Sequence, residues 1–137
     1  MAYESYKKDT HPFEVSIDEY AGKIQRWLSE VKPWLDPAFR MADISNTFAI
    51  NRTYVSRIFN RIFGESFSST IRKYRVEHAR KLLQSHRDFH LPQIAEMSGF
   101  RSASTLIRSY VAVYGITPRA DLARHDNDIS GNTPSTL

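Results

Sequence analysis

The chain contains no cysteine, which excludes disulfide bonds, thiolate metal sites and a thiol nucleophile. It also lacks a glycine-rich phosphate loop and a G-x-S-x-G nucleophile motif. No apolar run approaches the ~20 residues of a membrane-spanning helix. We therefore expect a protein without enzymatic activity, cofactor, metal or membrane contact, in keeping with a reducing, cytoplasmic location.

Acidic residues are scarce in the middle of the chain, whose overall composition is that of an ordinary soluble domain of 137 residues. Residues 52–119 carry twelve basic and four acidic side chains. By contrast, residues 1–51 carry six basic and eight acidic ones, and residues 120–137 carry one and three. A basic stretch of this kind is typical of nucleic-acid binding, and a solvated basic face is an equally weighted alternative.

One pattern of residues occurs twice in the chain, with the second copy 50 or 51 positions after the first. The matched residues are Ile44, Val55, Arg57, Phe59, Phe63, Gly64 and Phe67, then Ile94, Leu106, Arg108, Tyr110, Tyr114, Gly115 and Pro118. Each copy predicts a short apolar helix, a turn, and a second helix that carries an arginine and ends at a glycine. Two helix-turn-helix units in a basic stretch favour binding to duplex DNA.

Apolar periodicity and capping residues predict an all-α fold. Asn51 and Ser102 are good N-caps, Ser16 begins a capping box with Glu19, and Pro33 ends the first helix. The first helix carries an apolar stripe that we expect in the core, with a dimer seam as the alternative: Ile17, Tyr20, Ile24, Trp27, Leu28 and Val31. The predicted helices span residues 16–32, 42–48, 52–63, 67–85, 91–98, 103–114 and 118 to about 124.

Residues at the two ends of the chain show no helical pattern. Residues 1–15 are predicted to be a flexible linker or tail, and residues 125–137 a disordered tail. Between them, the helix predicted at residues 67–85 would be ~28 Å long, at 1.5 Å per residue. Successive major grooves on one face of B-DNA are ~34 Å apart. A stiff connector of this length can therefore place two reading helices about one DNA turn apart.

Three segments together resemble the DNA-binding domain of AraC/XylS-type bacterial transcription regulators. They are NRTYVSRIFNRIFGESF, IRKYRVEHARKLL and PQIAEMSGFRSASTLIRSYVAVYGITP, and the resemblance extends over about residues 18–124. It implies a seven-helix domain at residues 16–124, in which a long central helix joins two helix-turn-helix units. Such a domain reads double-stranded DNA with its third and sixth helices in successive major grooves. It usually activates transcription, which implies RNA polymerase as a second partner.

The resemblance also implies which side chains contact bases. In this chain they are Arg52, Thr53, Ser56 and Arg57 in the first unit and Ala103, Ser104, Thr105 and Arg108 in the second. Arginine suits this role because its guanidinium can bond to O6 and N7 of guanine together. Hydroxyl side chains can contact phosphates or bases. A phosphate contact or a surface salt bridge is the alternative for Arg57 and Arg108.

The chain departs from the family pattern at several positions. Asn60 and Val111 replace lysines that are common in the family, and 121–122 is Asp-Leu in place of the usual Tyr-Arg pair. The second reading helix has a single charge, Arg108, and is expected to expose Ile107. We therefore predict that the first unit contributes more of the DNA affinity, and the packing of the last helix stays open.

Alternatives remain for the organisation and the function. Family members usually carry a sensing or dimerisation domain, so the chain is either a small stand-alone regulator or the output domain of a longer parent. The linker-like residues 1–15 favour the parent. A helical protein-interaction module, using apolar surface such as Ile107, is the second functional hypothesis. His86 and His90 flank Asp88, but a surface loop is a better interpretation of this segment than a metal site.

Overall fold

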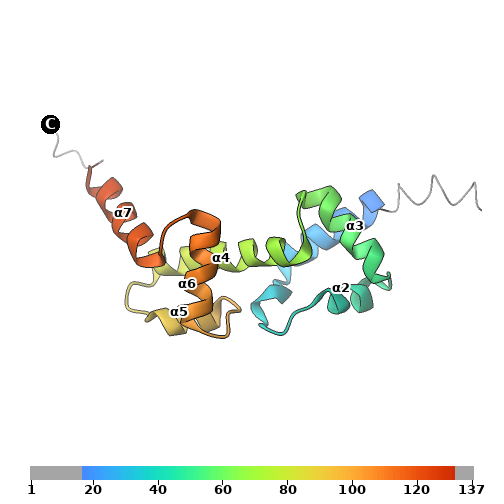
Figure 1. Cartoon of the computed structure of the whole chain (residues 1–137), viewed down its shortest axis with the longest axis horizontal. Coiled ribbons are helices and arrows are strands. Elements are labelled where there is room, and N and C mark those ends of the chain that lie inside the picture. Colours follow the sequence, from blue (N-terminus) through green and yellow to red (C-terminus); the bar gives the residue numbers. More distant parts are fainter. Residues whose placement is uncertain (1–16, 132–137) are drawn as a thin grey trace, which may run out of the picture. The chain divides into compact units, whose positions relative to one another are not determined.

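A computed structural model of the chain describes residues 17–131 (Figure 1). Within this range the chain forms seven α-helices, a short 3-10 helix and no strand, which confirms the all-α prediction. The predicted tail at 1–15, the cap at Ser16 and residues 132–137 lie outside the described range. The elements are a helix at 17–30, η1 (Pro33–Leu35), α2 (Met41–Phe48), α3 (Arg52–Phe63), α4 (Phe67–Ser85), α5 (Leu91–Met97), α6 (Ala103–Tyr114) and α7 (Pro118–Gly131).

The helices form two compact units, each with one helix-turn-helix. Of the described residues, the first unit contains 17–34 and 38–71, and the second contains 35–37 and 72–131. The boundary falls inside α4, which is one uninterrupted helix of 19 residues, as predicted. No helix in the described part of the chain is long and apolar enough to cross a membrane.

The core of the first unit confirms most of the apolar stripe predicted for the first helix. Val31 is the exception: its side chain is 61% exposed, because the helix ends at residue 30 and Lys32 adopts a positive φ of 56°. The chain then turns so that the indole of Trp34 donates a hydrogen bond to the carbonyl of Leu28, at 2.8 Å. The fully buried side chains of this core are Ile24, Leu28, Ile44, Val55, Ile58 and Phe59.

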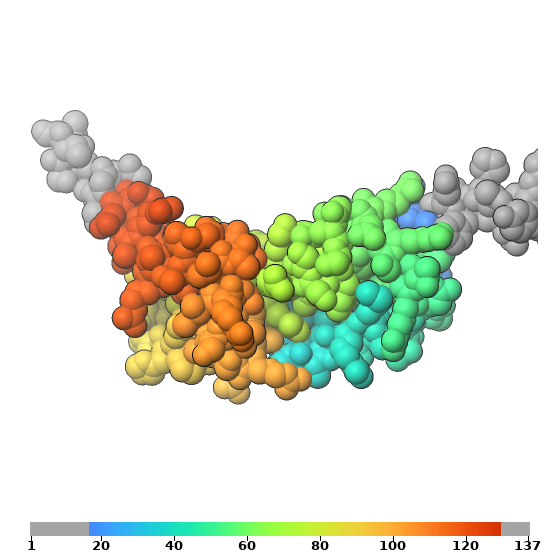
Figure 2. Space-filling view, in the orientation of Figure 1, coloured from blue at the N-terminus to red at the C-terminus, as the bar shows by residue number. Residues whose placement is uncertain are grey.

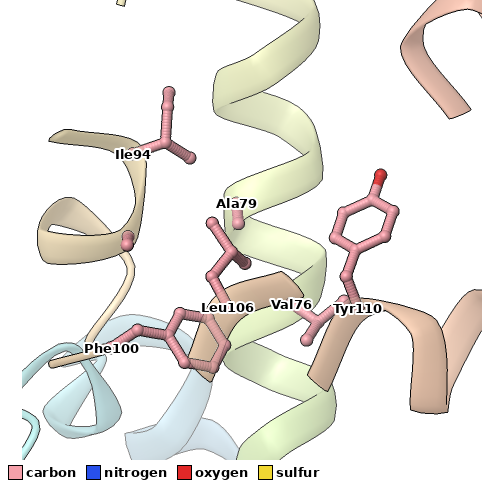
Figure 3. Close-up of a cluster of buried hydrophobic side chains, with 7 residues drawn as sticks. Val76, Ala79, Ile94, Phe100, Leu106 and Tyr110 are labelled. Carbon is pink, nitrogen blue, oxygen red and sulfur yellow. The ribbon is translucent and has the colours of Figure 1, made fainter. Parts of the chain in front are cut away.

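The second unit has its own core, in which α4, α5 and α6 meet (Figure 3). Helix α4 contributes only one face, with Val76 and Ala79 fully buried, so its opposite face is left for charged side chains. The hydroxyl of Tyr110 points away from the aliphatic side chains in Figure 3. The buried cluster consists of Val76, Ala79, Ile94, Ala95, Phe100, Leu106 and Tyr110.

Helix α7 is longer than the sequence indicates. It was expected to end near Arg124, with disorder from His125 onward, and this is wrong for residues 125–131, which are helical. A two-pronged ion pair connects this extension to the loop after α4: the Arg87 guanidinium donates to both carboxylate oxygens of Asp126, at 2.7 and 3.0 Å. These two residues are 39 positions apart, so no local pattern could indicate the contact.

The pairing of Arg87 with Asp126 predicts that the end of α7 depends on pH. The hydrogen bond from Arg87 lowers the pKa of Asp126 from its ordinary value of 3.8. A carboxyl group whose pKa is lowered by folding stabilises the folded state at any pH above its unfolded-state pKa. This stabilisation is lost as the pH falls through its folded-state pKa. We therefore expect the Cα chemical shifts of residues 125–129 to lose helical character below about pH 3.8. Arg87→Ala should show that loss already at pH 7, and shifts that stay helical until the whole domain unfolds in acid would contradict this.

Candidate nucleic-acid interface

The turn of the first helix-turn-helix positions the start of α3. Helix α2 ends at Phe48, and the left-handed φ of 57° at Ala49 reverses the chain. The hydroxyl of Ser45 donates to the carbonyl of Ile50. Asn51 then caps α3 as predicted, since its side chain accepts a hydrogen bond from the Tyr54 amide at 2.8 Å. At the other end, Gly64 adopts φ 68°, which terminates the helix.

The outer face of α3 carries the residues predicted to contact bases in the first unit. Arg52, Thr53 and Arg57 are exposed, whereas Ser56 is half-buried. Thr53 and Arg57 line a hollow of about 140 Å³ together with Asn51 and Tyr54, two residues that were not predicted as site residues. The structure thus brings Thr53 and Arg57 to one surface, and leaves Ser56 partly covered.

The second helix-turn-helix repeats this local design with glycine at the turn. Gly99 takes φ 87°, and the amide of Phe100 donates to the carbonyl of Ala95 at 2.9 Å. Phe100 is buried in the core and so fixes the turn against the second unit. Ser102 caps α6 as predicted, accepting from the Thr105 amide at 3.2 Å, and its hydroxyl also lies 2.9 Å from the Thr105 hydroxyl.

The predicted contact residues of the second unit differ in exposure. Ser104 and Arg108 are exposed, and Ala103 and Thr105 are half-buried. Ile107 was expected to be exposed, but it is half-buried. The large apolar side chain that α6 leaves exposed is Val111, at 40%. Helix α6, orange in Figure 2, forms part of the visible surface of the second unit.

A larger hollow of about 370 Å³ lies where α6 runs beside α4. Thr105 and Arg108 reach it from α6, together with Ser109 and Ala112, and Arg72 reaches it from α4. Arg72 was counted among the charges of the long helix and was not predicted as a site residue. No sequence pattern could have identified it, because its position near Arg108 results from the packing of α4 against α6.

Asp121, one of the residues that depart from the family pattern, connects α7 to α6. It is 6% exposed, accepts a hydrogen bond from the Tyr110 hydroxyl at 2.5 Å, and lies 3.0 Å from Nε of Arg80. The Arg80 guanidinium also stacks over the ring of Tyr114, 4.7 Å from its centroid. Burial and this hydrogen bond raise the pKa of Tyr110 well above its usual range. Asp121 of α7 is therefore joined to α6 and to α4 by two polar contacts, which answers the question of C-terminal packing that the sequence left open.

The histidines after α4 have structural roles. His86 stacks on Phe89, with ring centroids 4.7 Å apart, and its Nδ1 lies 2.9 Å from the Ser85 hydroxyl. His90 precedes α5 and occupies its N-cap position. These contacts agree with the interpretation of the segment as a connecting loop.

Comparisons with known proteins agree with the two-unit architecture. The chain is 33% identical over 76 residues to an uncharacterized HTH-type transcriptional regulator, YtdP, of Bacillus subtilis; the match covers 56% of this chain and 10% of that protein. It is 30% identical over 84 residues to the melibiose operon regulatory protein of Escherichia coli, covering 61% and 28%. The chain thus spans less than a third of the length of these relatives.

A solved structure and a family model complete the comparison. The DNA-binding domain of the global transcriptional factor AdpA, solved in complex with a target DNA, matches with a TM-score of 0.69. Sequence identity is 20% and the match covers 79% of this chain and 94% of that one, so the likeness shows the fold. Residues 44–124, more than half of the chain, match the family model described as a helix-turn-helix domain. The chain therefore belongs to the AraC-type family of helix-turn-helix DNA-binding transcription regulators.

Proposed function

We propose that this chain binds specific sequences of double-stranded DNA and thereby regulates bacterial transcription in the cytoplasm, most often as an activator. Helices α3 and α6 would enter successive major grooves and read the base edges there. The observation that carries the proposal is the repetition of one arrangement: in each unit a capped helix follows a left-handed turn and presents an exposed arginine, Arg57 or Arg108.

The chemistry of these exposed residues suits base reading. Each arginine can form two hydrogen bonds to guanine, which discriminate against other bases by about 1–3 kcal/mol. Thr53 and Ser104 can add hydroxyl contacts to bases or phosphates. The proposed base-contacting residues are Arg52, Thr53, Ser56 and Arg57 on α3, and Ala103, Ser104, Thr105 and Arg108 on α6.

The proposed function also implies two protein partners for this chain. An activator bound beside a promoter contacts RNA polymerase, and we propose the polymerase as the protein partner of the bound chain. A sensing or dimerisation domain of a longer parent would supply the signal. No residue of the interface is assigned a catalytic role.

Selection of bound duplexes from a random-sequence pool at moderate salt tests this proposal. We expect an asymmetric motif with two enriched blocks about 10 base pairs apart, because the two reading helices differ in sequence. Repeating the selection with Arg57→Ala and with Arg108→Ala should each weaken one block and leave the other intact. One block only would mean that α6 does not read bases. No enriched block, with binding that disappears at higher salt, would contradict sequence-specific binding by this chain.

A further inference from the structure

The hollow between α4 and α6 combines two arginines with a hydroxyl on a surface of the second unit. Arg72 projects from α4, and Arg108 and Ser109 project from consecutive positions of α6. The hollow has a volume of about 370 Å³, and its remaining lining comes from Thr105 and Ala112. No carboxylate lines it, so two positive side chains share one concave surface without an acidic neighbour in the lining.

Two other arginines of this unit have carboxylate partners. Arg80 is paired with Asp121, and Arg87 is paired with Asp126. Among the described residues, the side chains of Arg72, Arg108 and Ser109 form no hydrogen bond or ion pair. Two guanidinium groups that line the same hollow repel each other, and an anion bound beside Arg72 lowers that repulsion. The charge of the lining therefore favours a negatively charged ligand.

Phosphate is the anion that fits these donors. A guanidinium offers parallel N–H donors to the two non-bridging oxygens of a backbone phosphate, and the free Ser109 hydroxyl can donate to one of the same two oxygens. The Thr105 hydroxyl is already engaged with Ser102, at 2.9 Å. The hollow also opens beside Arg108, the exposed arginine of the proposed reading helix. A duplex that is read by Arg108 would have its backbone within reach of this surface.

We propose that the hollow binds one backbone phosphate of the DNA, with Arg72 as its main ligand and Ser109 as a hydroxyl donor, while Arg108 extends toward the base edges. This inference rests on the proposed DNA-binding function and adds α4 to the DNA-binding surface. A phosphate contact fixes the register of the protein on the duplex and carries no sequence information. It supplies the docking contact for a reading helix that has a single charge of its own.

The test compares Arg72→Ala with Lys81→Ala in the whole chain. Lys81 lies on the same helix, is highly exposed, pairs with Glu77, and does not line the hollow, so its removal changes the net charge equally. Affinity is measured for the selected duplex and for a scrambled duplex over a series of salt concentrations. We expect Arg72→Ala to weaken both by the same factor, about fivefold to tenfold, and to lower the slope of log K against log salt by about one. Lys81→Ala should change either quantity little, and Arg72→Lys should keep the slope.

A second measurement locates the contact on the DNA. Single phosphates of the selected duplex are replaced in turn by neutral methylphosphonates. For the wild-type chain, one position near the block read by α6 should weaken binding, and that position should have no further effect in Arg72→Ala. This loss of additivity identifies the phosphate that contacts Arg72. If Arg72→Ala alters the fold, circular dichroism will show it, and Arg72→Lys against the methylphosphonate series then provides the test.

Several results would overturn the inference, and they differ from failure of the proposed function. Unchanged affinity and salt slope in Arg72→Ala, with wild-type binding to the selected duplex, would reject the phosphate site alone. A loss confined to the selected duplex would make Arg72 a base reader. Millimolar inorganic phosphate could change the NMR chemical shift of the Ser109 amide while Arg72→Ala leaves DNA binding unchanged. That result would indicate a site for a free anion. Absence of wild-type binding to any duplex would reject the proposed function and this inference together.

Discussion

Replacing Arg57 by alanine is expected to weaken binding to the selected duplex by about 1–3 kcal/mol, or roughly 5- to 150-fold in Kd. Arg57 is exposed on α3 and lines a hollow with Thr53, so it can reach a base edge without rearrangement of the core. Fluorescence anisotropy with the selected duplex measures the loss. A duplex with the corresponding base pair replaced should bind wild type and variant almost equally, since the discriminating contact is then absent from both.

Arg61→Ala is the matched control for this prediction. Arg61 lies one turn further along α3, carries the same charge, and pairs with Asp18 of the first helix at 2.9 Å. Its loss should lower affinity only through the change in net charge, and therefore less than the loss of Arg57. Equal effects of the two substitutions would mean that Arg57 contributes only general electrostatic attraction. No effect of Arg57→Ala would reject base reading by this residue and favour the protein-interaction hypothesis.

Replacing Asp121 by alanine is expected to lower the free energy of unfolding of the second unit by about 2–3 kcal/mol, the magnitude of hydrogen bonds to a charged group. The substitution leaves the buried Tyr110 hydroxyl without its acceptor and Arg80 without its ion pair. The Arg80 side chain is 41% exposed, so water can solvate it after the change, and the loss stays below that of a fully buried pair. Urea denaturation followed by NMR signals of α6 and α7 measures the effect.

Glu77→Ala provides the comparison for Asp121, because it also removes one carboxylate but breaks only the exposed pair with Lys81. Little change is expected from it. Combining Tyr110→Phe with Asp121→Ala should cost less than the sum of the single losses, because both remove the same hydrogen bond. Additive losses would show that Tyr110 and Asp121 stabilise the unit independently, contrary to the contact in the structure.

The hydrogen bond from Tyr110 to Asp121 also predicts that the stability of the second unit falls at high pH. Burial and the bond to Asp121 raise the pKa of Tyr110 in the folded state. A tyrosine whose pKa is raised by folding stabilises the folded state fully at any pH below its unfolded-state pKa, which is about 10. This stabilisation is lost as the pH rises further. The second unit should therefore lose stability above about pH 10, and Tyr110→Phe should remove this part of the decline.

Local features of the sequence predicted the helices that present the candidate contact residues. The bounds of α3, α4 and α6 agree with the prediction at both ends. Their starts and stops depend on residues within one turn, such as Asn51 before α3 and Gly64 after it. A cap forms between neighbours in the chain, so it can be predicted without knowledge of the fold. The repeated pattern likewise indicated which helix of each unit faces outward.

Contacts between distant segments could not be predicted in this way. Asp126 of α7 contacts Arg87, 39 positions earlier in the chain, and the burial of Asp121 depends on α4 and α6. Ile107 looked exposed from its position on α6, but its surroundings half-bury it. Exposure is set by all elements that pack nearby, whereas periodicity describes one helix at a time.

The sequence by itself determined the helices, the two helix-turn-helix units, the family and the outward position of Arg57 and Arg108, because caps, turns and apolar periodicity act over a few residues. Only the tertiary structure decided that Arg72 of α4 lines a hollow with Arg108 and that Asp121 accepts a buried hydrogen bond from Tyr110 of α6. Both depend on the packing of α4 and α7 against α6, which brings together side chains far apart in the chain. Their positions follow from the shape of the shared core and not from any pattern along one segment.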